Sequence, residues 1–286
     1  MAEFVRIFEM SPRDGLQNEP GAIATSDKIR LIDLLSDCGF SKIECASFVS
    51  PKRVPQMADG ADVLAGIRRR RGVAYTALTP NMTGYERAIA AGADEVAIFA
   101  SASEGFSHKN IECSIAESLD RFRPVAARAQ ADKMPLRGYV SCVTDSPYDG
   151  PTAPADAARV ADALFQMGCY EISLGDTIGK GTPETISAML EAVLEAVPAG
   201  NLAGHYHDTG GRALENVAVS IGYGLRVFDS SAGGLGGCPF APGAKGNVAT
   251  EAVVEMLEAK GFATGIDRAK LAVAAEFARS LRKAHA

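Results

Sequence analysis

The sequence predicts a single (β/α)₈ barrel, a TIM barrel, that spans residues 1–286 and ends in an extra C-terminal helix. Three observations lead to this prediction: eight short apolar runs alternate with amphipathic segments, no linker divides the chain, and no repeat is visible beyond the strand–helix unit. Strands that alternate with helices form a parallel sheet, and eight such units in about 250 residues are typical of a closed barrel. An open doubly wound sheet is the alternative, but SPRDGLQN is not the glycine fingerprint that it would need after its first strand.

The eight apolar runs are short, as buried parallel strands are, and we expect strands at 4–9, 42–48, 73–78, 95–100, 137–143, 171–174, 202–207 and 226–230. Apolar residues recur with helical period at 27–38, 61–70, 84–91, 115–130, 154–167, 183–196, 213–222 and 248–259. Thr25 or Ser26 is expected to cap the first helix, and glycines such as Gly39 and Gly168 to end helices. The expected extra helix covers residues 268–285.

The composition excludes several classes of protein. Apolar residues make up 47% and charged residues 22% of the chain, which excludes a disordered or collagen-like protein. The net charge of −6 argues against a broad basic surface, so we expect no nucleic-acid partner. No run approaches the roughly 18 apolar residues of a membrane span, so we expect no membrane partner. The six cysteines are widely spaced and no signal peptide is visible, so we expect reduced thiols in a cytoplasmic protein.

The sharpest local feature is the pair His205 and His207 in the seventh predicted strand. Side chains at i and i+2 of a strand share one face, so both imidazoles can reach one point. Barrel enzymes gather their reactive groups at the carboxyl ends of the strands, where Asp14 follows the first strand. Two histidines and one carboxylate suit a divalent metal and leave positions for a substrate. For the HxH pattern alone, the alternative is a hydrogen-bonded pair of half-buried histidines.

Other charged residues follow predicted strands at the same end of the barrel. Arg13 could hold an oxyanion or a carboxylate by a forked contact. It could also pair with Glu44, near the end of the second strand, for structure alone. The two interpretations are compatible, because a carboxylate behind Arg13 would fix the direction of its side chain. Asp176 ends the sixth strand and adds a further carboxylate at this end.

A glycine-rich segment, GGLGGCPFAPGAKGN, follows the eighth strand over residues 233–247. Its spacing does not match the phosphate-binding loop, and it could be a mobile lid. Cys238 in this segment could act as an acid or base near the site, or it could be purely structural. Asn247 could cap the next helix or offer its carbonyl oxygen to a hard cation.

Together, these segments resemble the 3-hydroxy-3-methylglutaryl-CoA (HMG-CoA) lyase family of metal-dependent TIM barrels. The resemblance spans nearly the whole chain and rests on SPRDGLQNE, IECASFVSPKRVPQM, LTPN, FSHKNIECSI, GYVSCV, GCYEISLGDTIGKGTP, GHYHDT and DSSAGGLGGCPFAPGAKGNVATE. The Arg-Asp pair and the HxH pattern are shared with isopropylmalate-type synthases. GGCPFAPGAKGN and FVSPKRVPQM are more specific to the lyase.

The resemblance implies a set of site residues and a reaction. The implied ligands of Mg²⁺ or Mn²⁺ are Asp14, His205, His207 and Asn247, and the implied catalytic or supporting groups are Arg13, Glu44, Asp176, His205 and Cys238. The implied substrate is an acyl-CoA thioester, which the family splits into acetyl-CoA and acetoacetate. We further expect a homo-oligomer, a dimer or larger.

Three other functions compete with this one. A condensing synthase of the same barrel family would use the same metal and enolate, but such synthases usually carry a further domain for which 286 residues leave no room. A non-catalytic metal-binding barrel would lack an acid or base, whereas the family positions are filled. A Schiff-base aldolase would need a lysine at the carboxyl end of a strand, and none is seen.

Overall fold

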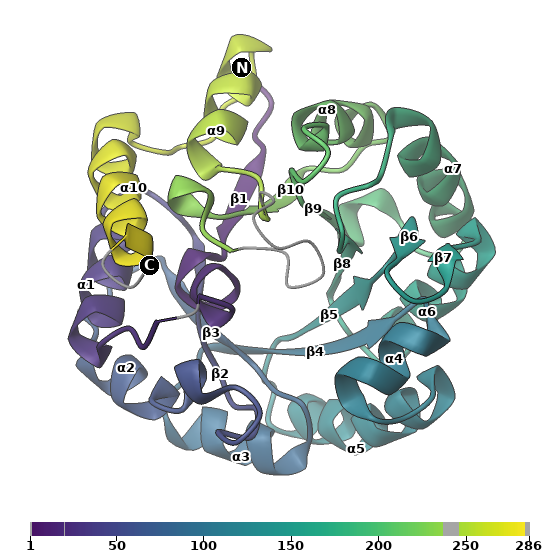
Figure 1. Ribbon diagram of the computed structural model, residues 1–286, viewed down its shortest axis with the longest axis horizontal. Coiled ribbons are helices and arrows are strands. Elements are labelled where there is room, and N and C mark those ends of the chain that lie inside the picture. The colour runs from purple at the N-terminus through teal and green to yellow at the C-terminus, as the bar shows by residue number, and fades with distance from the viewer. Residues whose placement is uncertain (1, 20, 237–245, 284–286) are drawn as a thin grey trace.

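The structure is a computed structural model, and it describes residues 2–19, 21–236 and 246–283. Eight parallel strands close into a barrel in the order β1-β10-β9-β8-β5-β4-β3-β2 (Figure 1). The strands are β1 (Arg6–Glu9), β2 (Lys42–Ser47), β3 (Ala74–Leu78), β4 (Glu95–Ser101), β5 (Leu136–Ser141), β8 (Glu171–Asp176), β9 (Leu202–Tyr206) and β10 (Val227–Ser230). The predicted (β/α)₈ barrel is therefore confirmed.

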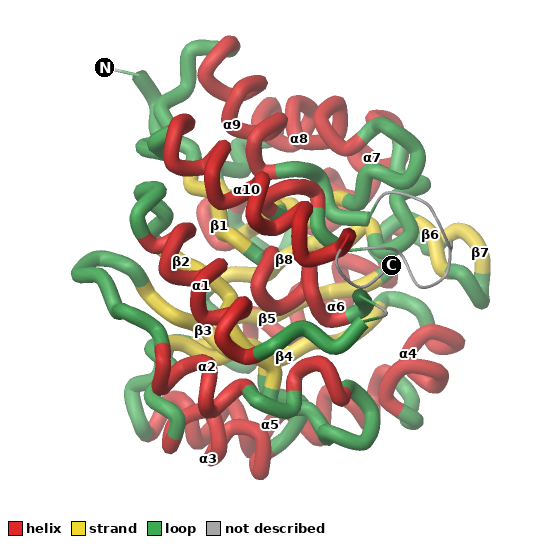
Figure 2. The backbone as a smooth tube through the Cα atoms, turned by 60° about the vertical axis from the view of Figure 1, so that its left-hand side comes forward, coloured by secondary structure: helices red, strands yellow, loops and turns green. Residues whose placement is uncertain are grey.

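A ring of helices covers the outside of the strands, and Figure 2 shows the strands enclosed by it. The helices that follow successive barrel strands are α1 (Thr25–Ser36), α2 (Gly60–Gly66), α3 (Met82–Ala90), α5 (Ile115–Ala131), α6 (Pro154–Gln166), α7 (Pro183–Leu194), α8 (Ala213–Gly222) and α9 (Thr250–Ala259). The expected extra helix is α10 (Arg268–Lys283), which lies beside α1 (Figure 1). None of the helices in the described ranges is long and apolar enough to cross a membrane.

Several predicted helix ends differ from the structure by a few residues, and tertiary contacts accompany the differences at α1, α2 and α9. α2 ends at Gly66 rather than at residue 70, since the backbone N–H of Arg68 donates to Asp33 of α1 at 2.8 Å. The N-cap of α1 is Ala24, and the predicted cap Thr25 instead donates its hydroxyl to Asp59 at 2.8 Å. α9 begins at Thr250 rather than at residue 248, because Asn247 and Ala249 form bridges with His207 and Ser231, the residues that follow β9 and β10.

Several short elements at the carboxyl ends of the strands were not predicted. A five-residue π-helix, η1 (Ser11–Gly15), follows β1 directly. α4 (Glu104–Ile111) replaces the loop expected after β4, and its cap Ser103 accepts from the N–H of Phe106 at 3.1 Å. A small hairpin, β6 (Asp145–Ser146) and β7 (Gly150–Pro151), precedes α6. All three lie at the end of the barrel that holds the site.

The interior of the barrel contains charge as well as apolar surface. A cluster of Phe8, Met10, Leu78, Ala97 and Tyr139 lies apart from the main core, which fills the space between strands and helices. The fully buried guanidinium of Arg137 lies over the rings of Phe8 and Tyr139, at 4.5 and 4.9 Å from their centroids. A buried arginine requires carboxylate partners, and the partners of Arg137 connect it to the site described below.

Candidate active site and metal centre

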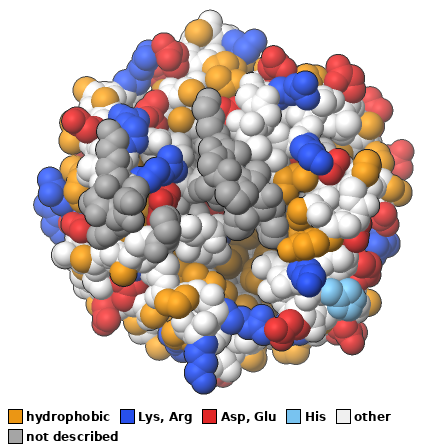
Figure 3. All heavy atoms as spheres, viewed as in Figure 1, with side chains coloured by type: hydrophobic (Ala, Val, Ile, Leu, Met, Phe, Trp, Pro, Cys, Tyr) orange, Lys and Arg blue, Asp and Glu red, His pale blue; other side chains and the backbone are white. Residues whose placement is uncertain are grey.

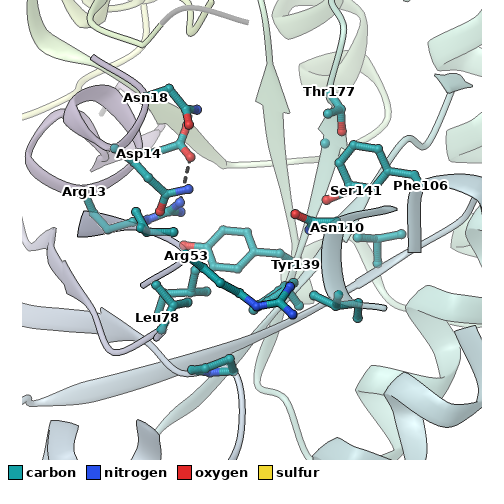
Figure 4. Close-up of a pocket in the computed structure, with 18 of the residues that line it drawn as sticks. Arg13, Asp14, Asn18, Arg53, Leu78, Phe106, Asn110, Tyr139, Ser141 and Thr177 are labelled. Carbon is teal, nitrogen blue, oxygen red and sulfur yellow. Dashed lines mark hydrogen bonds and ion pairs between the residues drawn. The ribbon is translucent and has the colours of Figure 1, made fainter. Parts of the chain in front are cut away.

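A cavity of about 770 Å³ opens at the carboxyl ends of the strands. Apolar and basic side chains surround a hollow on this face of the molecule (Figure 3). The close-up shows Arg13 and Asp14 on one side of the cavity, the Tyr139 ring near its centre, and Phe106, Ser141 and Thr177 on the opposite side (Figure 4). The part of the lining that concerns the chemistry is Arg13, Asp14, Tyr139, Ser141, Ser173, Thr177, His205 and His207.

Asp14, His205 and His207 converge at one edge of this cavity. Each offers one ligand atom, and the three atoms lie within 4.8 Å of one another. The two imidazole centroids are 5.4 Å apart, and Nε2 of His205 lies 3.8 Å from Oδ2 of Asp14. The predicted placement of both imidazoles toward one point is therefore found, and the group forms a candidate metal site.

The π-helix η1 turns Asp14 toward the histidines. It is closed by a bond from the N–H of Gly15 to the carbonyl of Met10, at 3.1 Å, and π-turns are frequent at functional sites. Gly15 must be glycine here, because a Cβ would lie 2.8 Å from the Ser231 hydroxyl and 2.9 Å from Cβ of Leu235. η1 therefore packs closely against the segment that follows β10.

Asn247 reaches the same place from the far end of the chain. Its backbone forms an antiparallel bridge with His207, and its Nδ2 donates to Oδ2 of Asp14 at 2.7 Å. It does not cap α9, whose N-cap is Ala249. The structure thus brings the predicted amide next to the carboxylate and the two histidines.

The environment of each metal-site residue suits a cation. Burial would raise the pKa of Asp14, but Arg13 and the two histidines lower it to about 2. Burial and then His205 lower the pKa of His207 to about 4, which favours its neutral form. Nδ1 of His207 is buried and has no hydrogen-bond partner among the described residues. Neutral imidazoles and carboxylates are ordinary ligands of divalent metals, so the residues present fit such an ion.

Arg13 is held by two carboxylates and lies at the cavity wall. Its Nε donates to Glu44 at 2.5 Å and its Nη1 to Asp14 at 2.7 Å. Glu44 is completely buried and also accepts from the Tyr139 hydroxyl at 3.0 Å. Burial alone would lower the pKa of Arg13, but these carboxylates raise it, so the guanidinium stays charged. The predicted pairing of Arg13 with Glu44 is therefore found.

His205 has a second partner, Asp229, which is not among the predicted site residues. Its Nδ1 lies 3.2 Å from Oδ2 of Asp229, the third residue of β10. Asp229 also accepts two bonds from Arg137, at 2.7 and 3.0 Å, and one from the Ser173 hydroxyl at 2.7 Å. A carboxylate behind a ligating histidine fixes its tautomer and ring orientation. Arg137 lies inside a predicted apolar strand, and this is the sequence feature that could have indicated a buried carboxylate nearby.

Asp176 does not line the described cavity. Asp176 is buried at the end of β8, where its carboxylate accepts from the Thr144 hydroxyl at 3.0 Å and from the N–H of Gly181 at 2.9 Å. Burial raises its pKa, and its neighbours Gly175 and Thr177 line the cavity instead. Cys238 lies outside the described residues. The five described cysteines, Cys38, Cys45, Cys113, Cys142 and Cys169, are buried free thiols.

The fold and the site define a (β/α)₈ barrel with a candidate divalent-metal centre at its mouth. A model of the HMGL-like family matches residues 4–278. The chain belongs to the HMGL-like family.

Relatives and solved structures agree with this family. The chain is 55% identical over 267 residues to a mitochondrial hydroxymethylglutaryl-CoA lyase of Gallus gallus, covering 93% of this chain and 90% of that protein. Other related lyases are named cytoplasmic. An HMG-CoA lyase structure from Brucella melitensis is 62% identical, with a TM-score of 0.98 and coverage of 99% and 100%. A lyase from Acinetobacter baumannii, solved with coenzyme A and 3-methylmalate, is 37% identical, with a TM-score of 0.92 and coverage of 98% and 92%.

Proposed function

We propose that this chain cleaves 3-hydroxy-3-methylglutaryl-CoA to acetyl-CoA and acetoacetate. The observation that carries the proposal is the convergence of Asp14, His205 and His207 beside the buried Arg13–Glu44 pair, in a cavity large enough for an acyl group. The names of the relatives support the substrate, and coenzyme A in the Acinetobacter structure supports a thioester. The barrel of residues 1–286 would form one catalytic domain.

The proposed resident ion is Mg²⁺ or Mn²⁺, held by Asp14, His205, His207 and Asn247. Oxygen and imidazole ligands suit both ions. Nδ2 of Asn247 now donates to Asp14, and turning the amide would present its oxygen in that direction. When bound, such an ion acts as a Lewis acid that lowers the pKa of a nearby hydroxyl.

Arg13 is proposed to stabilise the charge that develops on the thioester oxygen. Breaking the C2–C3 bond leaves the enolate of acetyl-CoA, whose negative charge lies on that oxygen. A buried, preoriented guanidinium stabilises such a charge more in the transition state than in the substrate. Glu44 fixes the direction of Arg13 and is itself held by the Tyr139 hydroxyl.

Proton transfer is proposed to involve His205 and Cys238. The C3 hydroxyl must lose a proton before the bond breaks, and the enolate must gain one afterwards. His205 faces Asp14 through Nε2 and is held by Asp229 at Nδ1. Either role of His205, metal ligand or proton carrier, would use Nε2, because Nδ1 faces Asp229. Cys238 is proposed to protonate the enolate, and Asp176 to keep the β8 loop, with Thr144 and Gly181, in place around the hydroxyl side of the substrate.

The mouth of the cavity is suited to the rest of an acyl-CoA thioester. Arg53, Asn110 and Arg121 line it, and guanidinium groups recognise phosphates well. Arg53 pairs at 2.6 Å with Glu112, which also lines the cavity. We also propose a cytoplasmic protein that forms a homo-oligomer, a dimer or larger.

The proposal is tested by incubating the protein with Mg²⁺ or Mn²⁺ and a series of 3-hydroxy-3-alkylglutaryl-CoA esters. Acetyl-CoA and acetoacetate should appear from the 3-methyl ester, and 3-methylglutaryl-CoA, which lacks the hydroxyl, should remain intact. If no ester releases acetyl-CoA with Mg²⁺ and none releases it with Mn²⁺, the proposal is contradicted.

The charge of Arg13 can be tested in the same assay. Arg13→Gln should lower kcat by about two orders of magnitude or more, with a modest change in KM, because the charge that it stabilises develops in the transition state. Arg121→Gln, at the mouth, is the matched control and should mainly raise KM. A kcat for Arg13→Gln equal to that of the wild type would remove Arg13 from the mechanism.

A further inference from the structure

Glu9 is a buried carboxylate to which the proposed reaction assigns no role. It is the last residue of β1 and is completely shielded from solvent. Its Oε1 accepts from the backbone N–H groups of Ser11 and Ala232, each at 2.9 Å, and its Oε2 accepts from the Thr250 hydroxyl at 2.7 Å. Burial raises the pKa of Glu9 to about 7 against these donors. Such a group is costly to bury, and its three partners lie on three different segments.

Each of these segments leads directly to the candidate metal site. Ser11 opens η1, which carries Asp14. Ala232 opens the short helix η4 (Ala232–Gly234), and the carbonyl of the following Leu235 accepts from Asn247 at 3.4 Å. Thr250 is the first residue of α9, three residues after Asn247. The Glu9 carboxylate therefore binds the first residue of each of the three segments.

The segments are packed too closely to move independently. A Cβ on Gly15 would lie 2.8 Å from the Ser231 hydroxyl, and one on Gly236 would lie 2.7 Å from Nδ2 of Asn247. Packing at this density transmits a displacement instead of absorbing it. A displacement of Ser11, Ala232 or Thr250 would therefore also displace the side-chain oxygens of Asp14 and Asn247.

We propose that Glu9 is a positioning residue, which holds Asp14 and Asn247 at the separation that one divalent ion needs. This inference rests on the proposed metal site. The competing explanation is that Glu9 contributes only to the stability of the barrel. The two explanations differ in what they predict for the metal affinity of folded variants.

The test is the Mn²⁺ affinity of the full-length protein, measured from the EPR signal of free Mn²⁺ and related to the folded fraction seen by circular dichroism. Glu9→Ala leaves two buried N–H groups without an acceptor and should weaken Mn²⁺ binding about tenfold or more, as the loss of supporting contacts at metal sites does. Glu9→Gln should restore binding to within a few fold. Its amide oxygen can accept both N–H bonds, and its NH₂ can donate to Thr250, which can donate to Ser230.

Glu95→Ala is the matched control. Glu95 is also a buried carboxylate, but it pairs with Lys42 and Tyr170 at the opposite end of the barrel. Its removal should destabilise the protein and leave the Mn²⁺ affinity unchanged. If Glu9→Ala does not fold, Thr250→Val decides. It removes the bonds of the Thr250 hydroxyl to Glu9 and Ser230 but leaves both N–H bonds of Glu9 in place, and it should weaken Mn²⁺ binding severalfold.

Unchanged Mn²⁺ affinity in the folded Glu9→Ala protein, or in Thr250→Val where that variant decides, would overturn the inference. Equal weakening by Glu9→Ala and Glu95→Ala would also overturn it. A wild-type protein that binds no Mn²⁺ would instead refute the proposed metal site, so the two failures can be told apart.

Discussion

His205 shows how a single buried contact can set the chemistry of a residue. Its Nδ1 is directed to Asp229, which leaves Nε2 facing Asp14. Asp229 is itself held by Arg137 and Ser173. Burial opposes the charged form of Asp229, but Arg137 and His205 lower its pKa, so it remains a carboxylate. The imidazole is therefore oriented before any ion or substrate arrives.

We predict that Asp229→Asn weakens Mn²⁺ binding and lowers kcat, each by about 10- to 100-fold, because partners behind ligating histidines have effects of this size. Isothermal titration and steady-state kinetics measure the two quantities. Glu171→Gln is the control, since Glu171 pairs with Arg137 at 2.7 Å and does not touch His205. If Asp229→Asn behaves like the control, Asp229 has no orienting role.

The raised pKa of Glu9 predicts that the free energy of unfolding depends on pH. Its pKa rises from 4.5 in the unfolded chain to about 7 in the folded protein, so the folded state binds the proton more tightly. The stabilisation is complete below pH 4.5 and is lost as the pH rises through about 7. Relative to Glu9→Gln, the wild type should therefore lose roughly 1–3 kcal/mol of unfolding free energy between pH 5 and 8. Urea denaturation measures this difference, and parallel pH profiles for the two proteins would exclude it.

At the scale of elements, the site depends on short irregular segments mounted on regular strands. The strands and the helices that follow them could be predicted, because their apolar periods reflect the two-layered packing of a barrel. η1 and α4 could not, since five to eight residues carry too little periodicity to be recognised. The π-turn in particular depends on a bond between Met10 and Gly15 and on the packing of Ser231 and Leu235 against Gly15.

The close packing around Gly15 predicts that one added methyl group at this position impairs the site. Gly15→Ala should displace η1 from the segment after β10 and lower both Mn²⁺ affinity and kcat by about tenfold or more, because an overpacked site shifts the backbone. Gly222→Ala is the control, since nothing lies within 4 Å of a Cβ there. Enzyme assays of both variants test the expectation, which fails if Gly15→Ala is as active as Gly222→Ala.

At the scale of the molecule, closure of the barrel creates the site. Asp14 follows β1 and the histidines belong to β9 and its end, and these strands are separated by β10 alone because β1 and β10 pair. The gathering of Arg13, Glu44, Asp14 and both histidines could be predicted, because carboxyl ends of parallel strands share one rim. The contacts of Asp229, Arg137 and Glu9 could not, since they depend on side-chain directions across the barrel interior.

The most direct test of the account is to titrate Mn²⁺ into the wild type, Asp14→Ala and His207→Ala, and to measure acetyl-CoA release from 3-hydroxy-3-methylglutaryl-CoA in the same samples. We predict one tightly bound Mn²⁺ per wild-type chain, no release in the presence of a chelator, and loss of both binding and release in each variant. Release at the wild-type rate by either variant, or by the wild type with its metal ions removed, would contradict it.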